Sequence, residues 1–198
     1  MTTIVISRKH GRVAIGGDST SHLGGSNFSR LHLRNHSKLI VRGDHHFAIT
    51  GDSVWRLALA EHYDRLETTP SLENSAEIYR FLLGRHAELS ETQWLSGGVD
   101  EAGDAFQSTR LTALFAGPGG IFGIFPDRTV VEFQRYFALG SGFEPALGAL
   151  HATYDELDSP TELVRRGLDA AACFDPTTAG PFDICEIALE GSTMAAER

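Results

Sequence analysis

The feature that most constrains the fold is the grouping of strands and helices into separate runs along the chain. Short apolar, β-branched runs between glycine-rich turns predict strands, and apolar residues at helical spacing predict helices. The order is strands, two helices, strands, two helices and a last strand. This order argues against a parallel βαβ sheet and favours stacked layers. We therefore predict an α+β fold, a four-layer αββα sandwich of two antiparallel sheets flanked by helices.

The expected elements have the following bounds. Strands are expected at 3–8, 13–18, 38–42, 47–50, 111–116, 121–125, 130–133 and 182–189. Helices are expected at 52–66, 71–89, 145–157 and 160–174. Residues 90–108 are expected to form a connector without periodicity, and the end of the chain is expected to fray.

The composition is that of an ordinary globular protein and argues against several functions. The chain has 198 residues, and we expect residues 1–198 to form a single domain. Its formal net charge is −9 and it has no basic run, which argues against a nucleic-acid partner. No apolar stretch reaches the roughly 18 residues of a membrane span, and no signal-peptide pattern is present. Cys173 and Cys185 lie in apolar surroundings and are expected to be buried free thiols in a cytoplasmic protein.

The start of the chain contains a candidate nucleophile. If Met1 is removed, Thr2 carries a hydroxyl and a free α-amine on one residue. The ordinary pKa of an α-amine is roughly 7.7–8.0, so part of it is an unprotonated base near neutral pH. Threonine activated by its own amine is a recognised form of covalent catalysis. The plainer interpretation is that small residues are common after an initiator methionine.

The residues that follow resemble a known family. The run Thr-Thr-Ile-Val at residues 2–5, the turn at Gly11 and the Gly17-Asp18 pair before a polar loop are similar to proteasome β-subunits and bacterial HslV. The resemblance to these N-terminal-nucleophile (Ntn) hydrolases extends over nearly the whole chain. It implies the Ntn-hydrolase fold and a threonine peptidase.

The same resemblance implies an aspartate and a lysine that support the threonine. Asp18 matches the aspartate that ends the second strand, and Lys38 best matches the lysine that opens the third. The intervening loop is then about four residues longer than usual, and Arg34 is the alternative that needs no gap. A nearby ammonium favours deprotonation of the attacking groups, and lysine shifts its pKa more readily than arginine. A solvated surface pair is the alternative for Asp18 and Lys38.

Other family positions can be matched in the same way. Gly51, before the first helix, matches the glycine whose N–H stabilises the oxyanion, and a helix N-terminus suits that task. Ile49 corresponds to the primary specificity pocket, where an aliphatic side chain would suit apolar substrates. Ser141, within Gly-Ser-Gly, matches the serine near the threonine amine. Each of these residues could instead have only a structural role.

The segment before the last strand departs from the family pattern. Asp175 corresponds to the aspartate of the family's Asp-x-x-Ser, but Thr178 replaces the serine and Pro176 lies between them. The added methyl of Thr178 restricts its side chain and is expected to crowd the amine. We therefore expect weak peptidase activity, improved by Thr178→Ser if the methyl is the obstacle.

The resemblance also implies partners. Stacked homo-oligomeric rings would enclose the sites, unfolded proteins or peptides would be the substrates, and an ATP-dependent unfoldase is implied only by analogy. No cofactor is implied. His45 and His46, like His32 and His36, lack the spacing of a metal-ligand set, so no metal is expected.

Three alternatives stay open at this point. The chain could be an Ntn amidase that acts on a small molecule, although such enzymes usually have larger insertions around the pocket. It could be a catalytically silent scaffold subunit, comparable to proteasome α-subunits, for which we would expect a helical extension before the first strand. It could also be a chamber protein in which a retained Met1 blocks the amine of Thr2.

Overall fold

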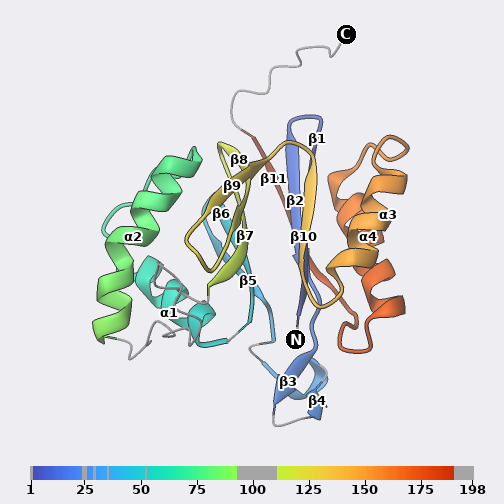
Figure 1. The fold of residues 1–198 in the computed structure, drawn as a ribbon, viewed down its shortest axis with the longest axis horizontal. Helices are drawn as coiled ribbons and strands as arrows, with labels where there is room; N and C mark the ends of the chain where they lie inside the picture. Colours follow the sequence, from blue (N-terminus) through green and yellow to red (C-terminus); the bar gives the residue numbers. More distant parts are fainter. Residues whose placement is uncertain are drawn as a thin grey trace.

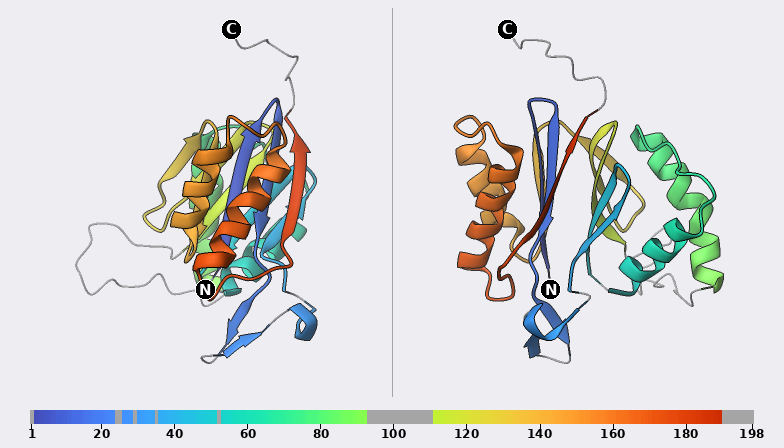
Figure 2. Two further views of the ribbon diagram at one scale, coloured as in Figure 1. Left: turned by 90° about the vertical axis from the view of Figure 1, so that its right-hand side faces the viewer. Right: turned by 180° about the vertical axis from the view of Figure 1, so that it is seen from behind.

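Two antiparallel sheets lie face to face between two pairs of helices, as Figure 1 shows. The right-hand view of Figure 2 shows the same four layers from behind. The structure, a computed structural model, describes residues 2–23, 26–28, 30–34, 36–51, 53–92 and 111–189. The predicted αββα sandwich is confirmed.

The first sheet contains the start of the chain. Its strand order is β10-β1-β2-β11, and neighbouring strands are antiparallel. The strands are β1 (Thr3–Lys9), β2 (Arg12–Gly17), β10 (Tyr136–Gly140) and β11 (Asp183–Ala188). Because side chains alternate between the faces of a strand, Ile4 and Ile6 pack between the sheets while Val5 packs against helices. Both faces of β1 are therefore covered.

The second sheet has the order β5-β6-β7-β8-β9 and is also antiparallel. The strands are β5 (Leu39–Arg42), β6 (His45–Thr50), β7 (Thr112–Gly117), β8 (Gly120–Ile124) and β9 (Val130–Phe133). One face buries the aromatic rings of Phe47, Phe115 and Phe122 beneath helices. The opposite face packs Ala48 and Leu114 into the layer between the sheets. The alternation of side chains along these strands therefore supplies both the layer beneath the helices and the layer between the sheets.

Each outer layer is a pair of helices. α1 (Ser53–Asp64) and α2 (Ser75–Thr92) cover the second sheet, and α3 (Phe143–Thr153) and α4 (Pro160–Phe174) cover the first. α4 has the predicted bounds because Ser159 caps it, accepting a hydrogen bond from the Glu162 amide at 3.3 Å, and Pro160 occupies its first turn. Among the described residues, no helix combines the length and apolarity needed to cross a membrane.

Several details differ from the sequence-based predictions. Strand β10 was not expected, and the loop after β2 contains two short strands, β3 (Ser21–Leu23) and β4 (Ser26–Phe28), and a 3₁₀ turn, η1 (Arg30–His32). α2 extends three residues past its predicted end, into the expected connector. The rest of that connector and the expected frayed end, residues 190–198, lie outside the described residues.

The prediction for the cysteines is wrong in part. Cys173 is exposed and Cys185 is half-buried, and both are free thiols. Cys173 lies near the end of α4, on the face that turns away from the sheet, so the apolar neighbours in its sequence do not cover it.

Candidate active site

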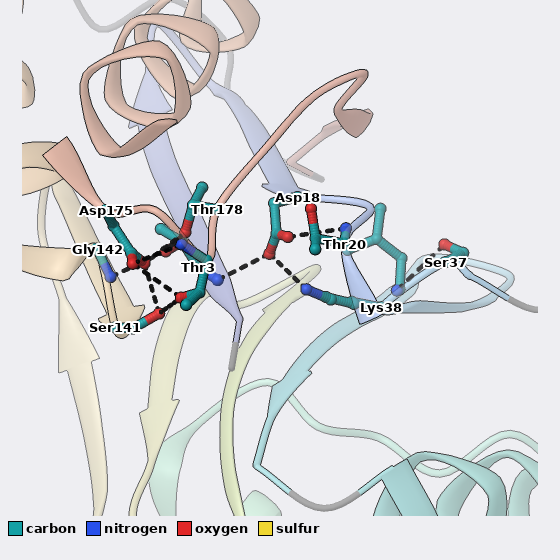
Figure 3. A network of polar contacts seen from close by, with 11 residues as sticks. Thr3, Asp18, Thr20, Ser37, Lys38, Ser141, Gly142, Asp175 and Thr178 are labelled. Atoms are coloured by element: carbon teal, nitrogen blue, oxygen red, sulfur yellow. Dashed lines mark hydrogen bonds and ion pairs between the residues drawn. The ribbon is translucent and has the colours of Figure 1, made fainter. Parts of the chain in front are cut away.

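The pairing of β1 with its two neighbours brings the predicted site residues together at one end of the first sheet. In the strand register, Thr3 lies opposite Gly140 of β10, and Ile4 lies opposite Gly17 of β2. Asp18 therefore follows β2 on one side of Thr3, and Ser141 follows β10 on the other. Figure 3 shows the resulting polar network, with Thr3 between two groups of side chains.

The first group is a buried ion pair. The Lys38 ammonium lies 2.5 Å from Asp18 Oδ1, and the carboxylate is fully buried. Backbone amides complete the pair: the Thr3 N–H donates to Oδ1 at 2.8 Å, and the Thr20 N–H donates to Oδ2 at 2.9 Å. Both carboxylate oxygens of Asp18 therefore accept hydrogen bonds.

Burial lowers the pKa of the Lys38 ammonium, although the charges of Asp18 and Asp175 and the hydrogen bond to Asp18 act in the opposite direction. Arg34, the alternative cation, is exposed. The structure thus places Lys38, not Arg34, against Asp18. The short strands and 3₁₀ turn after β2 take up the longer loop, so that Lys38 still comes directly before β5.

The second group surrounds Asp175, which follows α4. Its Oδ2 accepts hydrogen bonds from the hydroxyls of Ser141 at 2.6 Å and Thr178 at 2.7 Å. Its Oδ1 accepts bonds from the amide and the hydroxyl of Thr177, at 3.0 and 2.8 Å. Desolvation raises the pKa of Asp175, but these hydrogen bonds outweigh it and lower the pKa to about 2. Asp175 is therefore a firmly ionised anchor for three hydroxyl groups.

Thr2 lies just before β1 and is buried. Its carbonyl accepts a hydrogen bond from the Ser141 amide at 2.9 Å. Gly140 has a φ of +103°, and a Cβ there would lie only 1.8 Å from the Thr2 carbonyl oxygen. The predicted Gly-Ser-Gly segment thus contacts Thr2 directly, and only glycine fits its first position.

Thr3 is a site residue that the sequence-based predictions missed. Its hydroxyl lies 2.6 Å from that of Thr178 and accepts a hydrogen bond from the Gly142 amide at 3.0 Å. The alternation of β1 predicts a buried Thr3 on the face toward α3 and α4. Its polar partners come from residues about 140 and 175 positions later, so no local signal could have identified them.

The predicted oxyanion and specificity residues lie on the second sheet. Gly51 directly follows β6 and lies two residues before α1, and its φ of +92° is strained for other residues. Ile49 is buried in the cluster between this sheet and its helices, and its amide donates to the Lys38 carbonyl at 3.2 Å. Trp55 packs in the same cluster. The structure joins Ile49 to Lys38 through the backbone, whereas the roles of Ile49 and Gly51 stay predictions.

The His45–His46 pair forms no metal centre among the described residues, where no group of three or more potential ligands gathers. His45 is buried against the rings of Tyr63 and Phe115 instead. Burial lowers the pKa of both histidines.

Comparison with solved structures identifies relatives of this architecture. Thiobacillus denitrificans BPH is 36% identical, with a TM-score of 0.87 over 96% of this chain and 99% of its own. The same protein in complex with epoxomicin matches at 35% identity and a TM-score of 0.85, over 94% of this chain and 98% of that one. HslV from Trypanosoma brucei, at 21% identity and a TM-score of 0.62, covers 94% of this chain and 99% of its own and shares the fold. The chain belongs to the proteasome/HslV-type family. Comparisons with protein-family models and with curated proteins find no match.

In this proteasome/HslV-type subunit, the two polar groups lie on either side of residues 2 and 3. One group supplies a buried ammonium held by a carboxylate, and the other supplies hydroxyls held by an ionised aspartate. An ammonium favours loss of a proton from a neighbouring hydroxyl or amine, and hydroxyls can relay protons. The arrangement is suited to activating a nucleophile at the start of β1.

Proposed function

We propose that the protein is a threonine-type endopeptidase subunit of a self-compartmentalising ring protease, with Thr2 as its nucleophile after removal of Met1. The observation that carries the proposal is the hydrogen-bonded chain from Lys38 through Asp18 to the Thr3 amide. It fixes a buried ammonium beside the peptide unit that follows Thr2. A solvated surface pair, the alternative interpretation of these residues, would not be buried in this way.

The proposed reaction proceeds through an ester. The Thr2 hydroxyl attacks the peptide carbonyl, and its proton passes to the Thr2 α-amine, directly or through water. The Gly51 amide stabilises the oxyanion. The leaving amine takes the proton as the carbon–nitrogen bond breaks, which leaves an acyl-enzyme. Water, deprotonated by the same amine, then attacks the ester and releases the second product and the Thr2 hydroxyl.

The remaining residues would tune these proton transfers. The Lys38 ammonium lowers the pKa of the attacking groups, and Asp18 holds it in place. Ser141 and Thr178, ordered by Asp175, present hydroxyls beside the first residues of β1 and would orient the amine or a water molecule. Ile49 would select apolar substrate side chains. No cofactor takes part in these steps.

Assembly and location complete the proposal. A self-compartmentalising protease must enclose its sites, and closed rings of identical subunits achieve this. Stacked homo-oligomeric rings in the cytoplasm fit the family to which the chain belongs. Unfolded proteins or peptides would be the substrates of these rings. An ATP-dependent unfoldase would be the partner that supplies them.

The test is covalent labelling with epoxomicin, the compound present in the BPH complex. Intact mass spectrometry should show wild-type chains without Met1 that gain one inhibitor mass. Thr2→Ala should assemble normally but gain no mass, while Thr2→Ser should still react. Labelling of Thr2→Ala at the wild-type level would contradict the assignment of the nucleophile. A wild-type protein that retains Met1 and does not react would favour the silent chamber subunit.

A further inference from the structure

Thr3 lies between the two polar groups of the site: its hydroxyl contacts Thr178 and Gly142, and its backbone contacts Asp18. The proposed mechanism does not use this hydroxyl. We propose that Thr3 is a positioning residue, whose hydroxyl fixes the start of α3 and the Asp175 group relative to Thr2. This inference rests on the proposed function for its effect on turnover, although the contact itself can be tested without it. Thr3 is fully buried, so no solvent replaces its partners.

The chemistry of the partners sets the direction of every hydrogen bond. A carboxylate only accepts, so Thr178 must donate its one hydroxyl hydrogen to Asp175. Thr178 therefore accepts from Thr3 across their 2.6 Å contact, and Thr3 in turn accepts from the Gly142 N–H. An unbroken chain leads from the first turn of α3 through two threonine hydroxyls to an ionised aspartate.

The backbone of Thr3 connects this chain to the other polar group. Its N–H donates to Asp18 Oδ1 at 2.8 Å, and its carbonyl accepts from the Asp18 amide at 3.1 Å. Figure 3 shows Thr3 between Asp18 on one side and Gly142 and Thr178 on the other. Movement of Thr3 would therefore disturb both the Lys38 ion pair and the Asp175 group.

Two hydrogen bonds attach the Ser141–Gly142 segment to the start of β1. The Ser141 amide donates to the Thr2 carbonyl, and the Gly142 amide donates to the Thr3 hydroxyl. A valine at position 3 would match threonine in shape but would leave the Gly142 N–H without its acceptor and Thr178 without its donor. The loss of a hydrogen-bonded partner in a buried site is costly, so this segment should shift relative to Thr2.

The experiment compares Thr3→Val and Thr3→Ser with Ser7→Ala. Ser7 is a matched control because it lies four residues along β1, on the same face, and its buried hydroxyl makes no hydrogen bond in the described structure. We expect Thr3→Val to lower kcat on a fluorogenic peptide by tenfold or more, toward the roughly hundredfold loss that a displaced catalytic group can cause, with KM little changed. Thr3→Ser and Ser7→Ala should keep most of the wild-type kcat.

Hydrogen exchange supplies a measurement that is independent of activity. The Gly142 amide should exchange faster in Thr3→Val than in the wild type, and at the wild-type rate in Thr3→Ser and Ser7→Ala. If Thr3→Val fails to fold, Thr3→Ala, which cannot clash, is measured in the same way. Unchanged exchange at Gly142, or an equal loss of kcat in Ser7→Ala, would overturn the inference. If the wild type neither turns over peptide nor reacts with epoxomicin, the proposed function fails, and the exchange rates still decide whether Thr3 holds this segment.

Discussion

Replacing the members of the Asp18–Lys38 pair one at a time should have unequal effects on stability. Asp18→Asn removes the negative charge from a fully buried position while the Lys38 ammonium, only 10% exposed, stays beside it. The asparagine NH₂ would also have to face either the ammonium or the Thr20 amide, and both are donors. Asp18 opposes the lowering of the Lys38 pKa by burial, so without Asp18 that pKa falls further.

These contacts set the expected magnitudes. Leaving a buried charge without its partner typically costs about 3–5 kcal/mol, which we expect for Asp18→Asn. Lys38→Met keeps an apolar side chain of similar length, and Asp18 still accepts hydrogen bonds from the amides of Thr3 and Thr20. Its cost should be smaller than that of Asp18→Asn, because these two amides still partner the buried carboxylate. The double variant should be more stable than the sum of the single effects predicts, by roughly 0.5–3 kcal/mol.

Urea unfolding measures these differences as free energies, at one fixed protein concentration because subunit association would add to the apparent stability. Asp64→Asn is the control, since Asp64 forms an ion pair with Arg42 on the surface, at 2.7 and 2.9 Å. An exposed pair contributes about 0–1 kcal/mol. The reasoning is refuted if Asp18→Asn costs no more than Asp64→Asn, or if Lys38→Met costs as much as Asp18→Asn.

Three further predictions concern packing, pH and assembly. Gly142→Ala would place a Cβ 2.7 Å from the Thr3 hydroxyl and should lower both the melting temperature and peptidase turnover. Gly148 in α3 has open space around it, so Gly148→Ala should stabilise the protein by about 0.5–1 kcal/mol. Equal melting curves for the two variants would contradict this prediction. Burial lowers the pKa of His45 in the folded protein, so as the pH falls below about 6.5 the unfolded chain takes up a proton at this histidine before the folded chain does. The folded protein therefore loses stability as the pH falls through this range. His45→Gln should therefore show a smaller drop in melting temperature between pH 7.5 and 5.5 than the wild type, and an equal drop would show that other groups dominate. Native mass spectrometry should detect particles of about a dozen copies or more, and a monomer or dimer would favour the small-molecule amidase.

The sequence predicts most of the layers because the spacing of apolar residues indicates which face of each strand or helix is buried. The strand at residues 13–18, which follows the turn at Gly11, and the helix at 160–174 were both found close to the predicted positions. β10 was missed because it follows β9 without a glycine or proline between them. The chain crosses there from the second sheet to the first, and the partner of β10 is β1, at the other end of the sequence.

In the candidate site, too, features that depend on contacts between distant parts of the sequence were harder to predict. The resemblance placed Asp18, Lys38, Ser141, Asp175 and Thr178 in one site, and the structure brings them to the same end of the first sheet. Neither the resemblance nor the periodicity of the chain identified Thr3, because the role of a buried hydroxyl can be inferred only from its hydrogen-bond partners. The choice of Lys38 over Arg34 likewise depended on how a loop of more than a dozen residues folds, which local composition does not determine.

Thr178 shows how a departure from a family pattern can be compatible with the site that contains it. The added methyl was expected to crowd the amine, yet the hydroxyl contacts Thr3 at 2.6 Å and Asp175 at 2.7 Å, so the branch leaves both hydrogen bonds intact. A β-branched side chain has fewer accessible rotamers than serine, and at a buried position this restriction holds the hydroxyl toward its two partners. Pro176 is exposed, and its ring replaces an amide in a loop where Asp175 already accepts hydrogen bonds from Thr177. The unusual pair of residues therefore preserves the hydrogen-bonded order of the Asp175 group, and any effect of the methyl on activity would have to act on the amine of Thr2.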